Sequence, residues 1–312
     1  MSEMVSTRTG FGQGLVELAK ERDDIIVASA DTFRSFALKE FVQKWPDRYM
    51  EFGIAEQNMV TSCAAMAAQG YTVFAVGYSP FLSMRAVEQI RTFVAYPNLN
   101  VKIVAGLAGL SGDTDGVTHQ GTEDLGMIRP IPNMTLLCPA DAVAAEKMVK
   151  TAVDVPGPVY LRLGRGATPV LYSKEQEFPF GKAMIVRSYG KDAVLLSAGP
   201  CVGEAMQATD RLAATGIKAT VVDLHTVKPL DEEGVANACQ GARCVITIED
   251  GSIYGGIGSA VAEVLAEQKV NFGSFARLGL TTFGTAGTLP QLLGFFGLDA
   301  EAIAARVCEA LG

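Results

Sequence analysis

A glutamate stands at the head of a predicted helix in which small and apolar residues predominate. The stretch MEFGIAEQNMV, residues 50–60, places Glu56 at the start of a predicted helix in which Met59, Cys63 and Met66 recur at a spacing of three to four residues. Carboxylates are rarely buried without a partner. Glu56 therefore either complements the dipole of its own helix, which contributes up to about 1 kcal/mol, or meets a partner from elsewhere in the site.

The chain has two histidines, and both are predicted to follow strands. His119 lies in the polar loop SGDTDGVTHQ, residues 111–120, just past a strand predicted at 101–105. Loops at the carboxyl ends of parallel strands are where such folds bind ligands, so His119 is a candidate ligand contact. His225 lies at a predicted strand end in the second half of the chain. From the residues alone, a hydrogen-bonded structural histidine explains either position equally well.

Phosphate-binding motifs are not evident. Neither GxxxxGK[ST] nor a strand-linked GxGxxG occurs. The glycine-rich turn YGGIG, residues 254–258, precedes a predicted helix. Such a turn either binds an anion at the helix N-terminus or serves only close packing.

The composition is that of a globular protein without a nucleic-acid surface. At 312 residues the chain is long enough for two domains, and 49% hydrophobic residues can fill two cores. The net charge of −8, without a lysine- or arginine-rich run, argues against binding to nucleic acid or to an anionic membrane. No signal peptide or membrane-spanning run is visible. The six scattered cysteines are typical of reduced thiols and predict a cytoplasmic protein.

The elements that must position these residues alternate between strand and helix along the chain. Strands rich in β-branched residues, separated by helices, predict an α/β fold with two parallel-sheet domains covered on both faces. A polar segment predicts a linker at 173–187, between domains at 1–172 and 188–312. The predicted strands are 24–30, 71–76, 101–105, 134–138 and 159–163, then 192–198, 218–224 and 244–248; the predicted helices are 9–22, the helix headed by Glu56, 86–95 and 140–153, then 203–214, 231–239 and 258–267.

Four motifs in a fixed order resemble those of a known family. GIAEQNM (53–59), YSPF (78–81), DGVTHQ (115–120) and LRLGR (161–165) resemble the pyrimidine-binding domain of the transketolase family of thiamine diphosphate enzymes. The remainder, with DLHTVKP (223–229) and EDG (249–251), resembles the carboxyl-terminal domain of that family. The resemblance covers essentially the whole chain. It implies a pyrimidine-binding thiamine diphosphate fold followed by a transketolase carboxyl-terminal domain.

The resemblance implies a cofactor site around Glu56, with thiamine diphosphate as the cofactor. The matching glutamate of the family hydrogen-bonds a ring nitrogen of the aminopyrimidine and favours the tautomer that removes the proton from the thiazolium carbon. A water-poor pocket strengthens such a bond. Phe81 matches the aromatic residue that the family places against the pyrimidine ring. The alignment after Phe81 is ambiguous by one residue, and the apolar side chain of Met84 is a second candidate for the same wall.

The resemblance also implies a sugar-phosphate site. Arg8, Ser35 and Arg165 match positions at which the family grips the phosphorylated substrate, and arginine suits this task because its planar fork meets two phosphate oxygens at once. His119 matches the histidine that contacts the substrate carbonyl or hydroxyl groups. Asp115 matches the neighbour that reads a sugar hydroxyl.

The chain departs from the family pattern in two places. Leu107 stands near the position expected for a further histidine, which predicts an altered donor or acceptor preference, or an altered phosphate grip. The GDG…N motif, through which the family holds the diphosphate and its Mg²⁺ (or Ca²⁺) in a preceding domain, does not occur. We therefore expect the metal to be bound mainly by a partner subunit and expect no metal ligand in this chain.

The interpretation that unites these features is the carboxyl-terminal subunit of a split transketolase. It is expected to join an amino-terminal subunit in an α2β2 heterotetramer and to transfer a two-carbon ketol unit between phosphorylated sugars. A 1-deoxyxylulose-phosphate synthase-like enzyme and the β subunit of a 2-oxo-acid dehydrogenase are alternatives. A non-catalytic scaffold is a third, and retention of Glu56, His119 and Arg165 argues against it.

Overall fold

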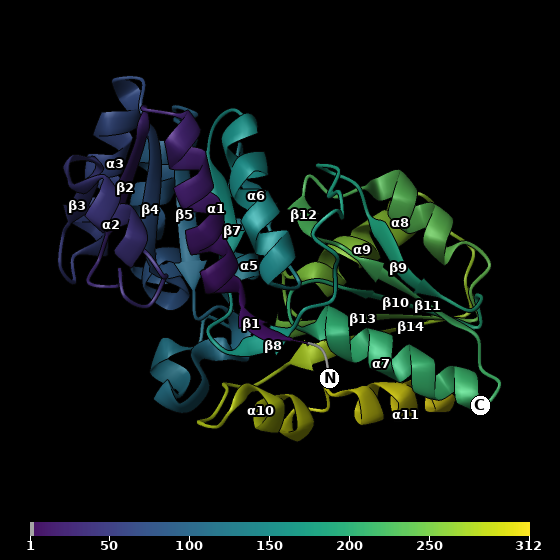
Figure 1. The fold of residues 1–312 in the computed structure, drawn as a ribbon. Helices are drawn as coiled ribbons and strands as arrows, with labels where there is room; N and C mark the ends of the chain where they lie inside the picture. Colours follow the sequence, from purple (N-terminus) through teal and green to yellow (C-terminus); the bar gives the residue numbers. More distant parts are fainter. Residues whose placement is uncertain (1–2) are drawn as a thin grey trace.

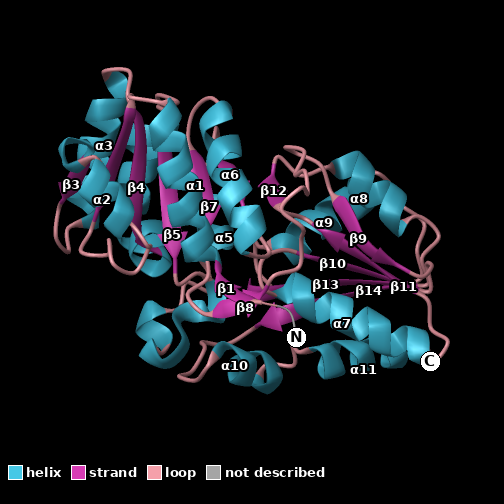
Figure 2. Cartoon of the chain, in the orientation of Figure 1, coloured by secondary structure: helices cyan, strands magenta, loops and turns pink. Residues whose placement is uncertain are grey.

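The computed structural model describes residues 3–312 and contains two main sheets, each covered by helices on both faces (Figures 1 and 2). The predicted α/β class with two largely parallel sheets is confirmed. All six cysteines are free thiols, and five of them are buried. Within residues 3–312, the helices are too short or too polar for any of them to cross a lipid bilayer.

The first sheet has seven strands in the order β12-β6-β7-β5-β4-β2-β3. Paired neighbours run parallel, except that β12 is antiparallel to β6. The central strands are buried on both faces, which is why the sequence shows them as continuous apolar runs. The strands are β2 (Ile25–Ser29), β3 (Tyr49–Glu51), β4 (Thr72–Tyr78), β5 (Val101–Gly106), β6 (Thr135–Leu137), β7 (Val159–Arg162) and β12 (Thr226–Lys228).

Helices cover the two faces of this sheet. On one face α1 (Thr7–Glu21) packs against α6 (Ala142–Asp154), and α2 (Lys39–Lys44) lies beside them. Gly10 permits this close approach, because a Cβ there would clash with the carbonyl oxygen of Ala142. The other face carries α3 (Glu56–Ala68), α5 (Asp124–Ile128) and a segment in which π-helical turns at Phe81–Arg85 and Ile90–Ala95 flank α4 (Val87–Gln89).

The second sheet has five strands in the order β14-β13-β10-β11-β9. The strands are β9 (Met184–Ser188), β10 (Ala193–Ser197), β11 (Ala219–Asp223), β13 (Cys244–Ser252) and β14 (Ser274–Leu280). In Figure 1, α7 (Cys201–Ala214) and α11 (Ala300–Leu311) lie below this sheet, and α8 (Glu232–Cys239) and α9 (Ile257–Glu267) lie above it. The short α10 (Leu289–Phe295) follows β14.

The structure adds features that the sequence pattern did not predict. Two strands run antiparallel to their neighbours, β9 to β11 and β12 to β6. β9 begins inside the range expected for the linker. β12 belongs to the second half of the chain but completes the edge of the first sheet. A further pair, β1 (Met4–Ser6) and β8 (Ala167–Pro169), is antiparallel, and the 86–95 segment is mostly π-helical instead of one α-helix.

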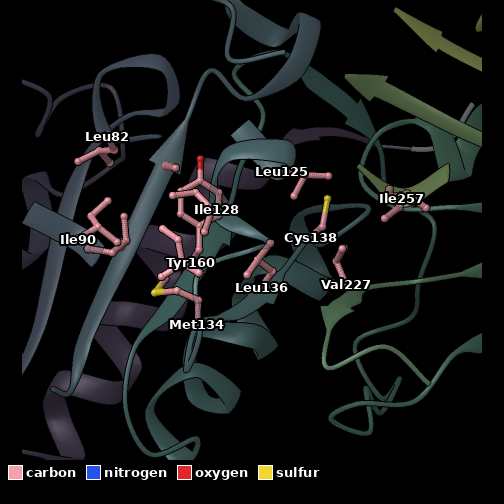
Figure 3. Packing of buried hydrophobic residues seen from close by; sticks show 14 of the residues in the cluster. Leu82, Ile90, Leu125, Ile128, Met134, Leu136, Cys138, Tyr160, Val227 and Ile257 are labelled. Carbon is pink, nitrogen blue, oxygen red and sulfur yellow. The ribbon is translucent and has the colours of Figure 1, made fainter. Parts of the chain in front are cut away.

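One hydrophobic core continues across the junction of the two units (Figure 3). Leu136 and Cys138, in and just after β6, belong to the same cluster as Val227 of β12 and Ile257 of α9. Each of these side chains is at most 2% exposed. The two units are therefore joined by apolar packing as well as by the chain itself.

A buried charge cluster lies at the same junction. Arg162, at the end of β7, is 4% exposed and donates from Nε to Asp124 Oδ2 (3.0 Å) and from Nη1 to Asp250 Oδ1 (2.7 Å). Asp250 lies on β13 of the second sheet. The hydroxyl groups of Ser79 and Tyr160 also donate to Asp124, over 3.0 and 3.1 Å. Although burial opposes its charge, the two carboxylates raise the pKa of Arg162. The cluster connects the second sheet to the turn that precedes Phe81.

Replacing Arg162 by methionine should strongly destabilise the chain, because it leaves the buried carboxylates without their cation. Breaking a buried pair in this way typically costs about 3–5 kcal/mol. Arg165→Met is the matched control, since the pair of Arg165 with Asp115 is 34% and 39% exposed and such a pair contributes at most about 1 kcal/mol. Urea unfolding followed by circular dichroism measures both. Equal losses in the two variants would contradict the buried-cluster interpretation.

Candidate active site

The residues predicted for the site lie at the carboxyl ends of parallel strands in the first sheet. Ser35 follows β2, Phe81 follows β4, His119 follows β5 and Arg165 follows β7. Parallel strands end at one edge of a sheet, so these loops come together. Glu56 joins them because α3 begins just after β3, which runs parallel to β2.

Glu56 is buried at the first residue of α3, and it has a partner. Its side chain is 3% exposed, and its Oε2 accepts a hydrogen bond from Arg85 Nη1 at 2.7 Å. No hydrogen bond to the other oxygen, Oε1, is found within residues 3–312. Glu56 is thus paired with a cationic side chain in addition to its position at the N-terminus of a helix. One oxygen of this buried carboxylate is left for a ligand.

Phe81, His119 and Ser35 are brought together around a tyrosine. The ring of Phe81 lies edge to face with His119 (5.4 Å between centroids), and Tyr78 lies 6.2 Å from Phe81 and 6.1 Å from His119. The hydroxyl oxygen of Tyr78 is 2.9 Å from Ser35 Oγ. His119 Nδ1 contacts the hydroxyl of Thr118 at 2.9 Å. Three residues predicted from the sequence therefore lie in one cluster.

An open hollow of about 400 Å³ adjoins this cluster. Phe81, Met84, Arg85 and Thr118 line it, and Phe283 reaches it from the loop after β14 of the second sheet. Met84 is 39% exposed there. The wall of the hollow is mostly apolar, and its charged residues are Arg85 and Glu123. Arg85 is the one that contacts Glu56.

Arg8, Asp115 and Arg165 form a second group of predicted residues. Arg165 donates to Asp115 Oδ2, and this hydrogen bond lowers the pKa of Asp115. Arg8 donates from Nη2 to the carbonyl oxygen of Arg165 at 3.2 Å. Arg8 Nε is buried without a hydrogen-bond partner in the described part of the chain. The guanidinium of Arg8 thus keeps an unused donor beside Arg165.

The two arginines near the end of β7 have different environments. Arg162 is enclosed in the buried cluster, whereas Arg165 lies past the strand end and is about one-third exposed. Of the two, only Arg165 is therefore placed to meet a ligand.

Leu107 stands where the family pattern leads us to expect a histidine. It is 1% exposed and adopts φ +57°, a left-handed conformation that is unusual for a residue other than glycine.

The other polar features of the sequence serve the chain itself. The glycine-rich turn before α9 binds the carboxylate of Glu249, which accepts from the backbone N–H groups of Ile257 and Gly258 at 2.8 and 2.9 Å. Burial raises the pKa of Glu249 to about 7. His225 packs against the ring of Phe178, and burial lowers its pKa to about 4. Within the described residues, no group of three or more His, Cys, Asp or Glu side chains is placed to hold a metal ion.

Sequence reasoning did not select Tyr78 and Arg85 as site residues. Tyr78 stands in the YSPF motif and could have been found from its place at the end of β4. Arg85 is harder to find, because its contact with Glu56 depends on the π-helical turn at Phe81–Arg85. The π-helical turn shifts by one residue the set of side chains that share a helix face. The sequence alignment is ambiguous by one residue in the same segment.

Comparison with known proteins agrees with this architecture. The family model described as the transketolase pyrimidine-binding domain matches residues 3–170, and that of the transketolase C-terminal domain matches residues 181–303. A protein of Methanocaldococcus jannaschii named as a putative transketolase C-terminal section is 41% identical, over 97% of this chain and 95% of its own length. A protein of Phocaeicola vulgatus, named as one subunit of an apulose-4-phosphate transketolase, is 34% identical, over 99% of this chain and 98% of its own length.

A solved structure is also similar to nearly the full length of this one. It is described as a split-gene transketolase in an inactive β4 tetramer, with a TM-score of 0.89, 36% identity and 99% coverage of both chains. The fold is thus a pyrimidine-binding domain followed by a transketolase carboxyl-terminal domain. The chain belongs to the transketolase family, as its four ordered motifs predicted.

Proposed function

We propose that this chain is the carboxyl-terminal subunit of a split transketolase that uses thiamine diphosphate to transfer a two-carbon ketol unit between phosphorylated sugars. Its partner is an amino-terminal subunit that carries the diphosphate and Mg²⁺ (or Ca²⁺) site, in an α2β2 heterotetramer of the cytoplasm. The near-complete coverage of relatives that are themselves named as a section or a subunit of a transketolase supports this proposal.

The observation that carries the proposal is the environment of Glu56. A buried carboxylate with one unused oxygen stands close to an aromatic ring and an open, mostly apolar hollow. These groups fit the aminopyrimidine ring of the cofactor, which offers N–H donors and a flat face. Glu56 would hold that ring by a hydrogen bond, and Phe81 and Met84 would form its apolar wall. Thiamine diphosphate, when bound, supplies the nucleophilic carbon that carries the ketol unit between donor and acceptor.

The second group of residues fits a sugar phosphate. Arg8 has a buried, unused Nε donor, and Arg165 uses only Nη1 in its contacts with Asp115 and Gly112. Phosphate oxygens would satisfy the remaining donors. Ser35 and Asp115 would hydrogen-bond sugar hydroxyls, and His119 would hold or move a proton at the substrate carbonyl or hydroxyl.

The alternatives receive less support. A 1-deoxyxylulose-phosphate synthase is ordinarily one longer chain, whereas the two relatives described above match this chain over nearly their whole length. The GIAEQNM and DGVTHQ motifs favour a transketolase over a 2-oxo-acid dehydrogenase subunit. A scaffold without activity has no use for a buried glutamate with a free oxygen.

Glu56→Gln should fold normally and lose most of the turnover of the reconstituted enzyme. The amide cannot share a proton with the pyrimidine as a carboxyl group does, and losing such a positioned contact costs on the order of a hundredfold or more. Glu249→Gln is the matched control, because Glu249 is equally buried, at 2% exposure, but lies in the second sheet. The measurement is turnover with cofactor in excess. If Glu56→Gln kept a rate within about twofold of the parent, the proposed role of Glu56 would be wrong.

Arg165→Ala and Arg8→Ala should each weaken phosphorylated substrates far more than their dephosphorylated analogues. A charge-assisted hydrogen bond contributes roughly 1.5–3 kcal/mol, which is about 10- to 150-fold in affinity. Arg187→Ala is the control, since Arg187 is 36% exposed and paired with an aspartate, as Arg165 is, but lies on β9. The specificity constants for a ketose phosphate and the free ketose give the comparison. Equal losses for both substrates would place the phosphate elsewhere.

A further inference from the structure

The guanidinium of Arg85 touches two of the three residues that the proposed function gives to the pyrimidine ring, Glu56 and Phe81. Its Nη1 donates to Glu56 Oε2 at 2.7 Å, and its central carbon lies 4.4 Å from the centre of the Phe81 ring. We propose that Arg85 is a positioning residue, which fixes the carboxylate of Glu56 and the ring of Phe81 relative to each other so that the cofactor's pyrimidine can meet both. This role rests on the proposed function and adds a residue that neither the motifs nor the comparisons identified.

The local backbone explains why Arg85 can make both contacts. Residues Phe81–Arg85 form a π-helical turn that begins after Pro80, and the N–H of Ala86 donates to the carbonyl oxygen of Phe81 at 3.1 Å. This i→i+5 bond widens the turn, and the guanidinium of Arg85 lies over the ring of Phe81. Such turns occur often at functional sites.

The turn that carries Arg85 is anchored to the protein interior. Ser83 Oγ donates to the carbonyl oxygen of Ser79 at 2.8 Å, and Ser79 Oγ donates to Asp124 at 3.0 Å. Asp124 belongs to the buried cluster around Arg162, and Leu82 is fully buried. Arg85 therefore extends from a fixed base, although its own side chain is 44% exposed.

The way in which the Glu56 oxygens are used supports a positioning role. Arg85 engages Oε2 through a single hydrogen bond and leaves Oε1 without a partner among the described residues. A bidentate pair would occupy both oxygens. Here the guanidinium instead lies over the Phe81 ring, so the carboxylate is oriented while one oxygen remains free for the N–H group of a ligand.

Two other interpretations of Arg85 make different predictions. A simple surface ion pair contributes little to either stability or binding, but Glu56 is buried and Arg85 also stacks on Phe81. A guanidinium that merely occupies the place of the pyrimidine, and leaves when the cofactor arrives, would oppose cofactor binding. Removal of Arg85 would then tighten binding, whereas a positioning residue predicts weaker binding.

The test uses the complex of the full chain with its amino-terminal partner, and thiamine diphosphate with Mg²⁺ as the probe. Arg85→Ala and Arg85→Lys are compared with Arg306→Ala, which removes an arginine that is 43% exposed and paired with a glutamate on α11. Isothermal titration calorimetry gives the cofactor Kd, and turnover at saturating cofactor gives kcat. Circular dichroism and thermal unfolding confirm that each variant folds and assembles.

We expect Arg85→Ala to raise the cofactor Kd by about tenfold or more and to lower kcat even when the cofactor saturates. Arg85→Lys should restore part of the affinity, because an ammonium group can donate to Glu56 but cannot stack flat on Phe81. Arg306→Ala should match the parent in both quantities. Three results would each overturn the role of Arg85. They are a Kd and kcat for Arg85→Ala equal to those of Arg306→Ala, tighter cofactor binding by Arg85→Ala, and no gain in affinity for Arg85→Lys over Arg85→Ala. No cofactor binding by the unaltered complex would overturn the proposed function itself, and the role of Arg85 with it.

Discussion

The buried pairing of Arg162 with Asp124 and Asp250 is the interaction on which the geometry of the site depends. A guanidinium and two carboxylates removed from water are stable only while each remains matched, so this cluster defines one arrangement of the two sheets. It joins β7 to β13, and through Asp124 and Ser79 it also holds the turn that leads to Phe81 and Arg85. The second unit therefore helps to position residues of the first, although it contributes few side chains to the hollow itself.

The predicted site residues form two groups with different chemistry. Glu56, Phe81 and Arg85 form a group suited to a flat heteroaromatic ring, in which one buried carboxylate oxygen is held and the other is free. Arg8 and Arg165 form a group with unused guanidinium donors, suited to an anion. Asp115 pairs with Arg165, and in the proposed function an anion would compete for this arginine. Both groups lie at one edge of a parallel sheet, where the ends of several strands bring distant residues together.

Much of this arrangement could be predicted from the sequence. The continuous apolar runs indicated parallel strands. Residue type and position made Glu56 and His119 candidates, but it was the resemblance of four ordered motifs to the transketolase family that gave them a predicted role. Arg85 could not be predicted as a site residue from the sequence, because its contact with Glu56 depends on a π-helical turn that the pattern of side chains does not predict. β12 was missed because a strand of three residues has no periodicity, and its partner β6 lies about ninety residues away in the chain. His225 and the glycine-rich turn showed the reverse: both were candidates by type, yet the structure uses them for packing and for binding Glu249.

The central claim is that this chain supplies only part of a composite active site. The direct measurement is ketol transfer from a ketose phosphate to an aldose phosphate, assayed for the purified chain, for an amino-terminal subunit carrying the GDG…N motif, and for their mixture, each with thiamine diphosphate and Mg²⁺. The account predicts no turnover from either subunit alone and restored turnover on mixing, saturating at equal amounts of the two subunits. Robust transfer by this chain alone would contradict it.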